Sequence, residues 1–206
     1  MRIAFKEWAV VVDALGHGGQ IIILRKGGIR EQRSSFQMEH LQFVLFPTLF
    51  HQQRESVVSD AQARFDQISR TFPSKDRVRL EFFAEVVEWQ RLDSLAAAEP
   101  LRGQHIWREE VIAERFGRGK EKSIFALAVR VLCLPTVIEL LVQESYGGCK
   151  SWIELEQEIT VAGACPVLSD EAFACKLNAF RAALGSRTRS NGTGNLAANR
   201  FPAQTG

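Results

Sequence analysis

Two cations followed by two glycines form the first candidate site in the sequence. Arg25, Lys26, Gly27 and Gly28 come directly after an apolar, β-branched run. Glycines leave backbone amides accessible, so amides and cations at the end of a strand could hold a phosphate group. The segment lacks the full phosphate-loop pattern, which argues against a nucleoside triphosphate as ligand. A hairpin turn with positive-φ glycines and solvated cations is the structural alternative.

Histidines and an acid form a second candidate set, suited to proton transfer. His51 and His105 could act as general acid or base if a carboxylate fixed the tautomer, and Glu39 or Glu55 could supply that carboxylate. In the alternative interpretation, these histidines make structural hydrogen bonds at helix starts. No two histidines have the helical spacing of a metal site, so the sequence predicts no metal and no cofactor.

Further cations lie beside aromatic residues or glycines. Trp107 precedes a dense basic stretch that begins at Arg115, and such a pair could stack a base and contact a phosphate backbone. Lys150 follows Gly147, Gly148 and Cys149 just before a predicted helix start, where amides favour an anion. The alternative is a set of solvated cations that complement helix ends. A nucleophilic role for Cys149 is a further option.

Residue periodicity predicts the elements that must position these groups. Helical spacing occurs at residues 5–15, 56–68, 106–116, 151–159 and 170–184, and strand patterns occur at 20–25, 43–46, 78–89 and 124–134. Pro47 and Pro135 predict the ends of two strands, and a slip in alternation predicts a bulge within 78–89. Ser151 and Glu154 fit a helix capping box. The irregular order favours an α+β fold with a mixed or antiparallel sheet flanked by helices.

Composition predicts one globular domain at residues 1–185 and a disordered tail at 186–206. The chain has 206 residues, of which 46% are hydrophobic and 24% charged, as in ordinary globular proteins. Three of the 26 basic residues lie in the polar tail, which has no acid, so 23 basic residues face 24 acidic ones in the body. This balance excludes a global positive field, and any anion site must be local.

The sequence also predicts a cytoplasmic location. The longest apolar candidate for a membrane span, at residues 124–141, contains Arg130, Pro135 and Glu139, so it is too polar to cross a bilayer. The N-terminal segment has no apolar stretch typical of a signal sequence. Four cysteines without paired C-x-x-C spacing predict reduced thiols rather than a zinc ribbon.

An ordered set of short motifs resembles a bacterial family catalogued as domain of unknown function 1802. The motifs are Phe5-Lys-Glu-Trp8, Leu24-Arg-Lys-Gly-Gly-Ile29, Phe46-Pro-Thr48 with His51-Gln52, His105-Ile-Trp107, Arg115-Phe116, Tyr146-Gly-Gly-Cys-Lys-Ser-Trp152 and Pro166-Val-Leu-Ser-Asp170. The family has no established activity. Some members are thought to occur beside restriction-endonuclease-like domains, which implies a link to restriction, defence or nucleic-acid processing. The strand order is also similar to PUA-like β-barrel modules, which read nucleotides.

The leading hypothesis is a non-enzymatic module that recognises DNA, RNA or a nucleotide-like anion. Arg25, Lys26, Arg115 and Lys150 would contact phosphate, and Trp107 would offer a stacking surface. The rival is a small phosphodiester hydrolase or nuclease that uses the His51, His105 and Glu39 set. A third possibility is a structural subunit that binds a protein partner in a larger complex. The sequence leaves the oligomeric state open.

Overall fold

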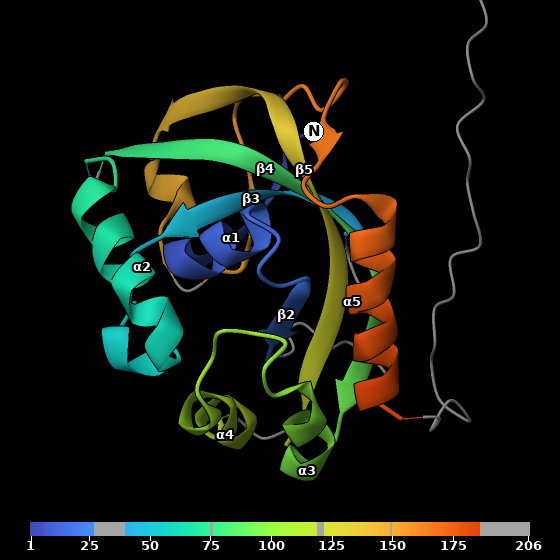
Figure 1. Cartoon of the computed structure of the whole chain (residues 1–206). Helices are drawn as coiled ribbons and strands as arrows, with labels where there is room; N and C mark the ends of the chain where they lie inside the picture. Colours follow the sequence, from blue (N-terminus) through green and yellow to red (C-terminus); the bar gives the residue numbers. More distant parts are fainter. Residues whose placement is uncertain (27–39, 75, 119–121, 149, 186–206) are drawn as a thin grey trace, which may run out of the picture.

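A seven-stranded mixed sheet is the frame of the protein (Figure 1). The computed structural model describes residues 1–26, 40–74, 76–118, 122–148 and 150–185. The strands are β1 (Ile3–Trp8), β2 (Ile22–Arg25), β3 (Gln42–Thr48), β4 (Arg77–Leu92), β5 (Ile124–Leu141), β6 (Trp152–Glu154) and β7 (Cys165–Pro166). Their order is β2-β5-β4-β3-β1-β6, with β7 paired to β5. The β1–β3 pair is parallel and the other pairs are antiparallel.

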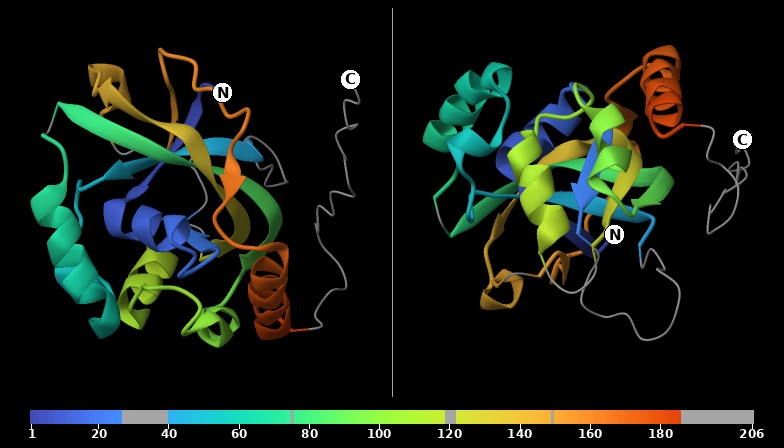
Figure 2. Two further views of the ribbon diagram at one scale, coloured as in Figure 1. Left: turned by 45° about the horizontal axis from the view of Figure 1, so that its top comes forward. Right: turned by 90° about the horizontal axis from the view of Figure 1, so that it is seen from below.

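Helices surround this sheet, which curls into a half-barrel (Figures 1 and 2). The helices are α1 (Ala9–Gly16), α2 (Ser59–Thr71), α3 (Leu95–Ala98), α4 (Glu109–Gly117) and α5 (Asp170–Ala183). Three short 3-10 turns, η1 (Arg54–Ser56), η2 (Glu99–Leu101) and η3 (Glu144–Tyr146), complete the described elements. The α1 helix lies inside the curve of the sheet, and α5 runs beside β5 (Figure 1). The predicted α+β class with a mixed, helix-flanked sheet is therefore confirmed.

The central strands are buried on both faces, because two apolar clusters lie on opposite sides of them. Phe5 and Phe43 belong to the larger cluster, whereas Ala4 and Val44 belong to the smaller one. Successive side chains of a strand point to opposite faces, so one strand can serve both clusters. This double burial explains the nearly continuous apolar sequence of β3.

The predicted helix at residues 5–15 is wrong in its first part. Residues Ile3–Trp8 form strand β1, and only Ala9–Gly16 is helical. Phe5 and Trp8 fit helical spacing, but β1 finds backbone partners in β3 and β6. The parallel β1–β3 pairing joins segments more than 30 residues apart, and local periodicity contains no information about it.

Neither predicted proline stop ends its strand. Pro47 lies within β3 at a point where the β3–β4 register, which covers Gln42–Val44, has already ended. Pro135 lies within β5, opposite the register shift between Leu80 and Phe82 of β4. Proline is tolerated in strands where no ladder hydrogen bond needs its missing N–H group.

The predicted capped helix at residues 151–159 is also wrong. The segment pairs with β1 as the short strand β6, and the Ser151 carbonyl accepts a hydrogen bond from the Lys6 amide at 2.8 Å. Instead of capping a helix, the Ser151 hydroxyl accepts a hydrogen bond from the Arg25 guanidinium. A side chain from a distant strand thus replaces the local partner that the capping box assumes.

Other predicted elements are confirmed. Strand β4 is long and irregular, with register shifts at two places along β5. The predicted helix at residues 170–184 is α5 (Asp170–Ala183), and Ser169, for which no capping role was predicted, accepts a hydrogen bond from the Ala172 amide at 3.2 Å. Cys133, Cys165 and Cys175 are free thiols. Cys149 and the predicted tail at 186–206 lie outside the described residues.

Gly16 ends α1 against the ring of Phe82, and this contact leaves no room for a side chain. A Cβ atom at Gly16 would lie 2.3 Å from the nearest Phe82 ring carbon. Phe82 is 9% exposed within the larger apolar cluster, so its ring has little space to move. We expect Gly16→Ala to lower the free energy of unfolding by about 2 kcal/mol, as overpacking does. Urea denaturation measures this change.

Gly117 provides the matched control, because it also ends a helix. A Cβ atom there would meet no heavy atom within 4 Å. We expect Gly117→Ala to be neutral or to stabilise the protein by up to about 1 kcal/mol, since alanine favours helix. Equal losses for both variants would contradict the overpacking argument.

Candidate anion-binding site

A buried carboxylate marks the centre of the candidate site. Glu7 lies near the end of β1 on the same face as Phe5, and its residue is 5% exposed. Its Oε1 atom accepts a hydrogen bond from the Trp8 amide at 2.8 Å. Its Oε2 atom lies 3.9 Å from Nη1 of Arg25. Buried carboxylates need such partners, because desolvation of an unpaired charge is costly.

Arg25, at the end of β2, connects this carboxylate with neighbouring strands. Its guanidinium donates to the Lys6 carbonyl at 3.3 Å and to the Ser151 hydroxyl, and it lies 4.3 Å from the centre of the Phe5 ring. Burial lowers the pKa of the Arg25 guanidinium, Glu7 opposes that change, and Arg115 adds to it. The side chain stays 27% exposed, so the group is held in place but open to solvent.

Arg115 reaches the same region from α4. Its Nη1 atom donates to the Leu24 carbonyl at 2.9 Å, and its guanidinium lies 3.8 Å from the centre of a Trp107 ring. Burial lowers the pKa of Arg115, Glu7 raises it and Arg118 lowers it further. Helix α4 and strand β2 are therefore joined by an arginine whose charge interacts with that of Glu7.

Lys26 adds a third cation at the end of β2. Its Nζ atom donates to the Phe116 carbonyl near the end of α4 at 3.3 Å. We define the arginine cluster as Glu7, Arg25, Lys26 and Arg115. The guanidinium groups of Arg25 and Arg115 both interact with Glu7, and Glu114, which Arg118 also engages, raises the pKa of Arg115 as well. These charges lie in a partly desolvated setting, where they interact more strongly than in water.

His105 borders the cluster as an uncharged group at neutral pH. Its Nδ1 atom accepts a hydrogen bond from the Trp107 amide at 3.2 Å. Burial, followed by the positive charge of Arg115, lowers the pKa of His105 to about 4, and a hydrogen bond with the Trp107 backbone partly opposes the shift. The acid–base prediction required a carboxylate beside His105, whereas the charged group that acts on its ring is the Arg115 guanidinium.

The structure gathers some of the predicted residues and separates others. Arg25, Lys26 and Arg115 meet in the arginine cluster, and Lys150 is an exposed neighbour of Ser151. His51 lies on an exposed turn with φ 57°, its ring 3.9 Å from that of Phe50. Three further candidates, Gly27, Gly28 and Glu39, lie outside the described residues.

Trp107 does not offer the open ring face that its predicted stacking role needs. The residue is 2% exposed, with Arg115 over its ring and the Trp8 ring at 4.8 Å in an edge contact. An isolated antiparallel β-bridge pairs the backbone of Trp107 with that of the buried Val57, and the Trp107 side chain belongs to the larger apolar cluster. Trp8 is the half-buried aromatic residue of this pair.

Sequence reasoning missed Glu7, Lys6 and Ser151. The incorrect helix at residues 5–15 hid the alternation that places Phe5 and Glu7 on one face and Lys6 on the other. Lys6 donates to the Tyr146 and Gly148 carbonyls at 2.7 and 2.8 Å, and thereby fixes the glycine segment before Lys150. No local pattern marks Glu7 as buried, because its charged partners Arg25 and Arg115 lie far from it in the sequence.

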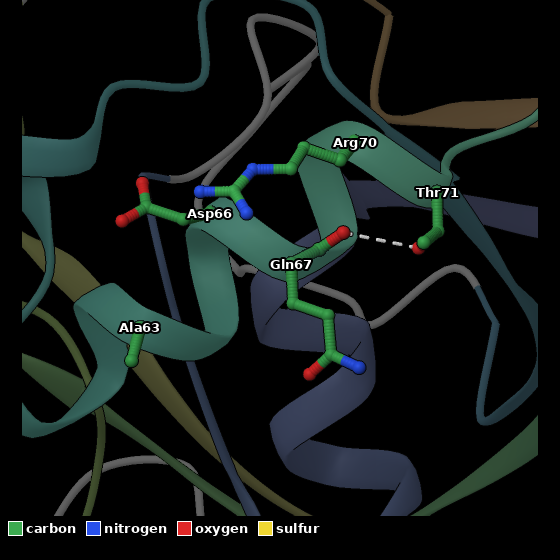
Figure 3. Close-up of a pocket in the computed structure, with 5 residues that line it drawn as sticks. All are labelled: Ala63, Asp66, Gln67, Arg70 and Thr71. Atoms are coloured by element: carbon green, nitrogen blue, oxygen red, sulfur yellow. Dashed lines mark hydrogen bonds between the residues drawn. The ribbon is translucent and has the colours of Figure 1, made fainter.

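A hollow of about 370 Å³ elsewhere does not involve these residues. It is lined by Ala63, Asp66, Gln67, Arg70 and Thr71 of α2 (Figure 3). All five belong to one helix, and the Thr71 hydroxyl donates to the Gln67 carbonyl at 3.1 Å.

Within the described part of the chain, no group of three or more His, Cys, Asp or Glu could hold a metal ion. In the same part, none of the helices combines the length and apolar character needed to span a bilayer.

The fold and the cluster define an α+β protein with a curled mixed sheet and a partly buried group of arginines at the ends of β1 and β2. The chain belongs to the family described as domain of unknown function DUF1802, whose model matches residues 4–179. No curated protein matches the chain. A solved structure, a mutant of ZmASCH from Zymomonas mobilis, is similar at 12% identity over 69% of this chain and 90% of that chain, with a TM-score of 0.36.

Proposed function

We propose that this protein recognises nucleic acid or a nucleotide-like anion, and that the arginine cluster contacts its phosphate. The main support for this proposal is that Arg25 and Arg115 both interact with the buried carboxylate of Glu7. Lys26 joins them through the Phe116 carbonyl. A phosphate would accept charge-assisted hydrogen bonds from these cations, and such bonds are about twice as strong as neutral ones.

The access and orientation of the cations support this proposal. Arg25 is 27% exposed, while bonds to Lys6 and Ser151 hold its planar group in one orientation. A guanidinium so oriented matches two phosphate oxygens at once, and little side-chain entropy is lost on binding. Lys150, next to Ser151 and exposed, would contact a neighbouring phosphate of a longer strand.

Bases would be recognised by shape and stacking rather than by a sequence code. Trp8 is the half-buried ring beside the cluster, since Trp107 is covered by Arg115. Aromatic rings stack any base, because every base has a π-face. The protein would therefore bind single strands or nucleotides with modest sequence preference.

Fluorescence anisotropy with short single-stranded RNA and DNA tests the proposal. We expect measurable affinity that falls as salt rises from about 50 to about 200 mM, because phosphate contacts release counterions. Arg25→Lys keeps the charge and loses the planar fork, so we expect about tenfold weaker binding. Lys26→Gln and Lys150→Gln should weaken binding and reduce its salt dependence.

Arg70→Gln is the matched control, because it removes one exposed cation from α2, outside the cluster. We expect it to leave the affinity unchanged. Absence of binding, binding indifferent to salt, or an equal loss in Arg70→Gln would overturn the proposal. Urea denaturation of each variant confirms that it folds before its affinity is compared.

A further inference from the structure

Two cysteines lie directly opposite each other on neighbouring antiparallel strands. Cys133 of β5 is the register partner of Cys165 of β7. Both residues are exposed, and both are free thiols in this structure. Register partners place their side chains on the same face of a sheet, so the two sulfur atoms share one solvent-facing side.

The backbone around this pair has the spacing that a disulfide needs. Directly opposed residues in antiparallel strands have Cα atoms about 4.5–5.5 Å apart, within the range of about 4.4–6.8 Å that disulfides span. The Val167 amide donates to the Val131 carbonyl at 3.0 Å, which fixes the register two residues away. Opposed residues have Cβ atoms about 4.5–5.5 Å apart and disulfides have them about 3.5–4.5 Å apart, so an S–S bond here needs side-chain rotation and a small closer approach of the two strands.

A tight turn holds Cys165 in this position. The Ala164 amide donates to the Val161 carbonyl at 3.0 Å, and Gly163 has φ 85°. The Cys165 thiol lies 3.6 Å from the Gly163 carbonyl oxygen. Burial raises the pKa of the Cys133 thiol, and Cys165 and then Glu81 raise it further, so the two cysteines interact electrostatically.

We propose that Cys133 and Cys165 form a reversible disulfide that tethers β7 to β5 when a hydroperoxide oxidises the protein. One thiolate attacks the peroxide, the O–O bond breaks, and the sulfur becomes a sulfenic acid while water or an alcohol leaves. The second thiol then attacks this sulfur, so that an S–S bond forms, the S–O bond breaks and water leaves. The two sulfurs together give two electrons to the peroxide.

The disulfide would close the chain between β5 and β7 into a covalent loop. That loop carries β6 and Ser151, which the structure already ties to β1 and Arg25. Closing a loop of this length restricts the unfolded chain, so the oxidised protein should melt about 10 °C higher than the reduced one. The inference is independent of the proposed anion binding.

Hydrogen peroxide treatment of the full chain tests this inference. Peptide mapping without reductant should recover a peptide that links Cys133 to Cys165, and calorimetry should show the rise in Tm. Dithiothreitol should reverse both. Cys133→Ser and Cys165→Ser should each lose the linked peptide and the Tm shift, whereas Cys175→Ser, at another exposed cysteine, should keep both.

Three results would overturn the inference. The first is a dominant linkage through Cys149 or Cys175. The second is peroxide oxidation to sulfinic or sulfonic acid without a linked peptide. The third is a linked peptide without a rise in Tm, since the bond would then not tether the native strands.

Discussion

Arg25→Met is expected to lower the free energy of unfolding by about 3 kcal/mol, because it leaves Glu7 buried with a weakened set of partners. Glu7 is 5% exposed, and Arg25 lies 3.9 Å from it while bonding to two neighbouring segments. Removal of one partner of a buried ion pair is costly, because the remaining charge keeps its desolvation penalty. Urea denaturation at neutral pH measures the loss.

A double-mutant cycle separates the charge effect from lost packing. In a Glu7→Gln background, Arg25→Met should cost clearly less, because no carboxylate is left without its partner. Arg77→Met is the matched control, since Arg77 is 53% exposed and lies 3.9 Å from an exposed Glu139. An exposed pair contributes less than about 1 kcal/mol. The argument fails if Arg25→Met costs no more than Arg77→Met, or if Glu7→Gln does not reduce its cost.

The free energy of unfolding should decrease as the pH is lowered, because His105 is buried in its neutral form. The pKa of His105 is lowered from 6.5 to about 4 in the folded protein. Below pH 6.5 His105 is protonated in the unfolded chain but stays neutral in the folded protein. The free energy of unfolding therefore decreases as pH falls. The loss continues until the folded pKa is reached. Linkage gives about 2 kcal/mol at pH 5 and about 3 kcal/mol at pH 4.

His105→Asn isolates this contribution, because asparagine can still accept the hydrogen bond from the Trp107 amide but does not titrate. The difference in stability between wild type and this variant should shift in favour of the variant between pH 7 and pH 4. His51→Asn, on the exposed turn with φ 57°, is the control and should follow the wild type. A pH-independent difference between wild type and His105→Asn would contradict the burial argument.

Most helices and strands that depend on the spacing of nearby residues could be predicted from the sequence. The periodicity of α5, the irregular long strand β4 and the apolar run of β2 all follow from residues that are close together in the sequence. Such features could be predicted because side-chain spacing decides which face is buried. The family resemblance was likewise present in short ordered motifs and is confirmed by the match over residues 4–179.

Tertiary structure alone decided the candidate site. β1 and β2 lie near opposite ends of the strand order, so Glu7 meets Arg25 because the sheet curls, while Arg115 reaches β2 from a helix about 90 residues away. The predicted partner of Ser151 was the local Glu154, whereas its hydroxyl accepts a hydrogen bond from Arg25. Trp107 was predicted to stack a base, whereas its ring packs against Trp8 of β1. The sequence determines which side chains are apolar and which are charged. The pairing of remote strands determines which of the charged side chains are buried next to one another.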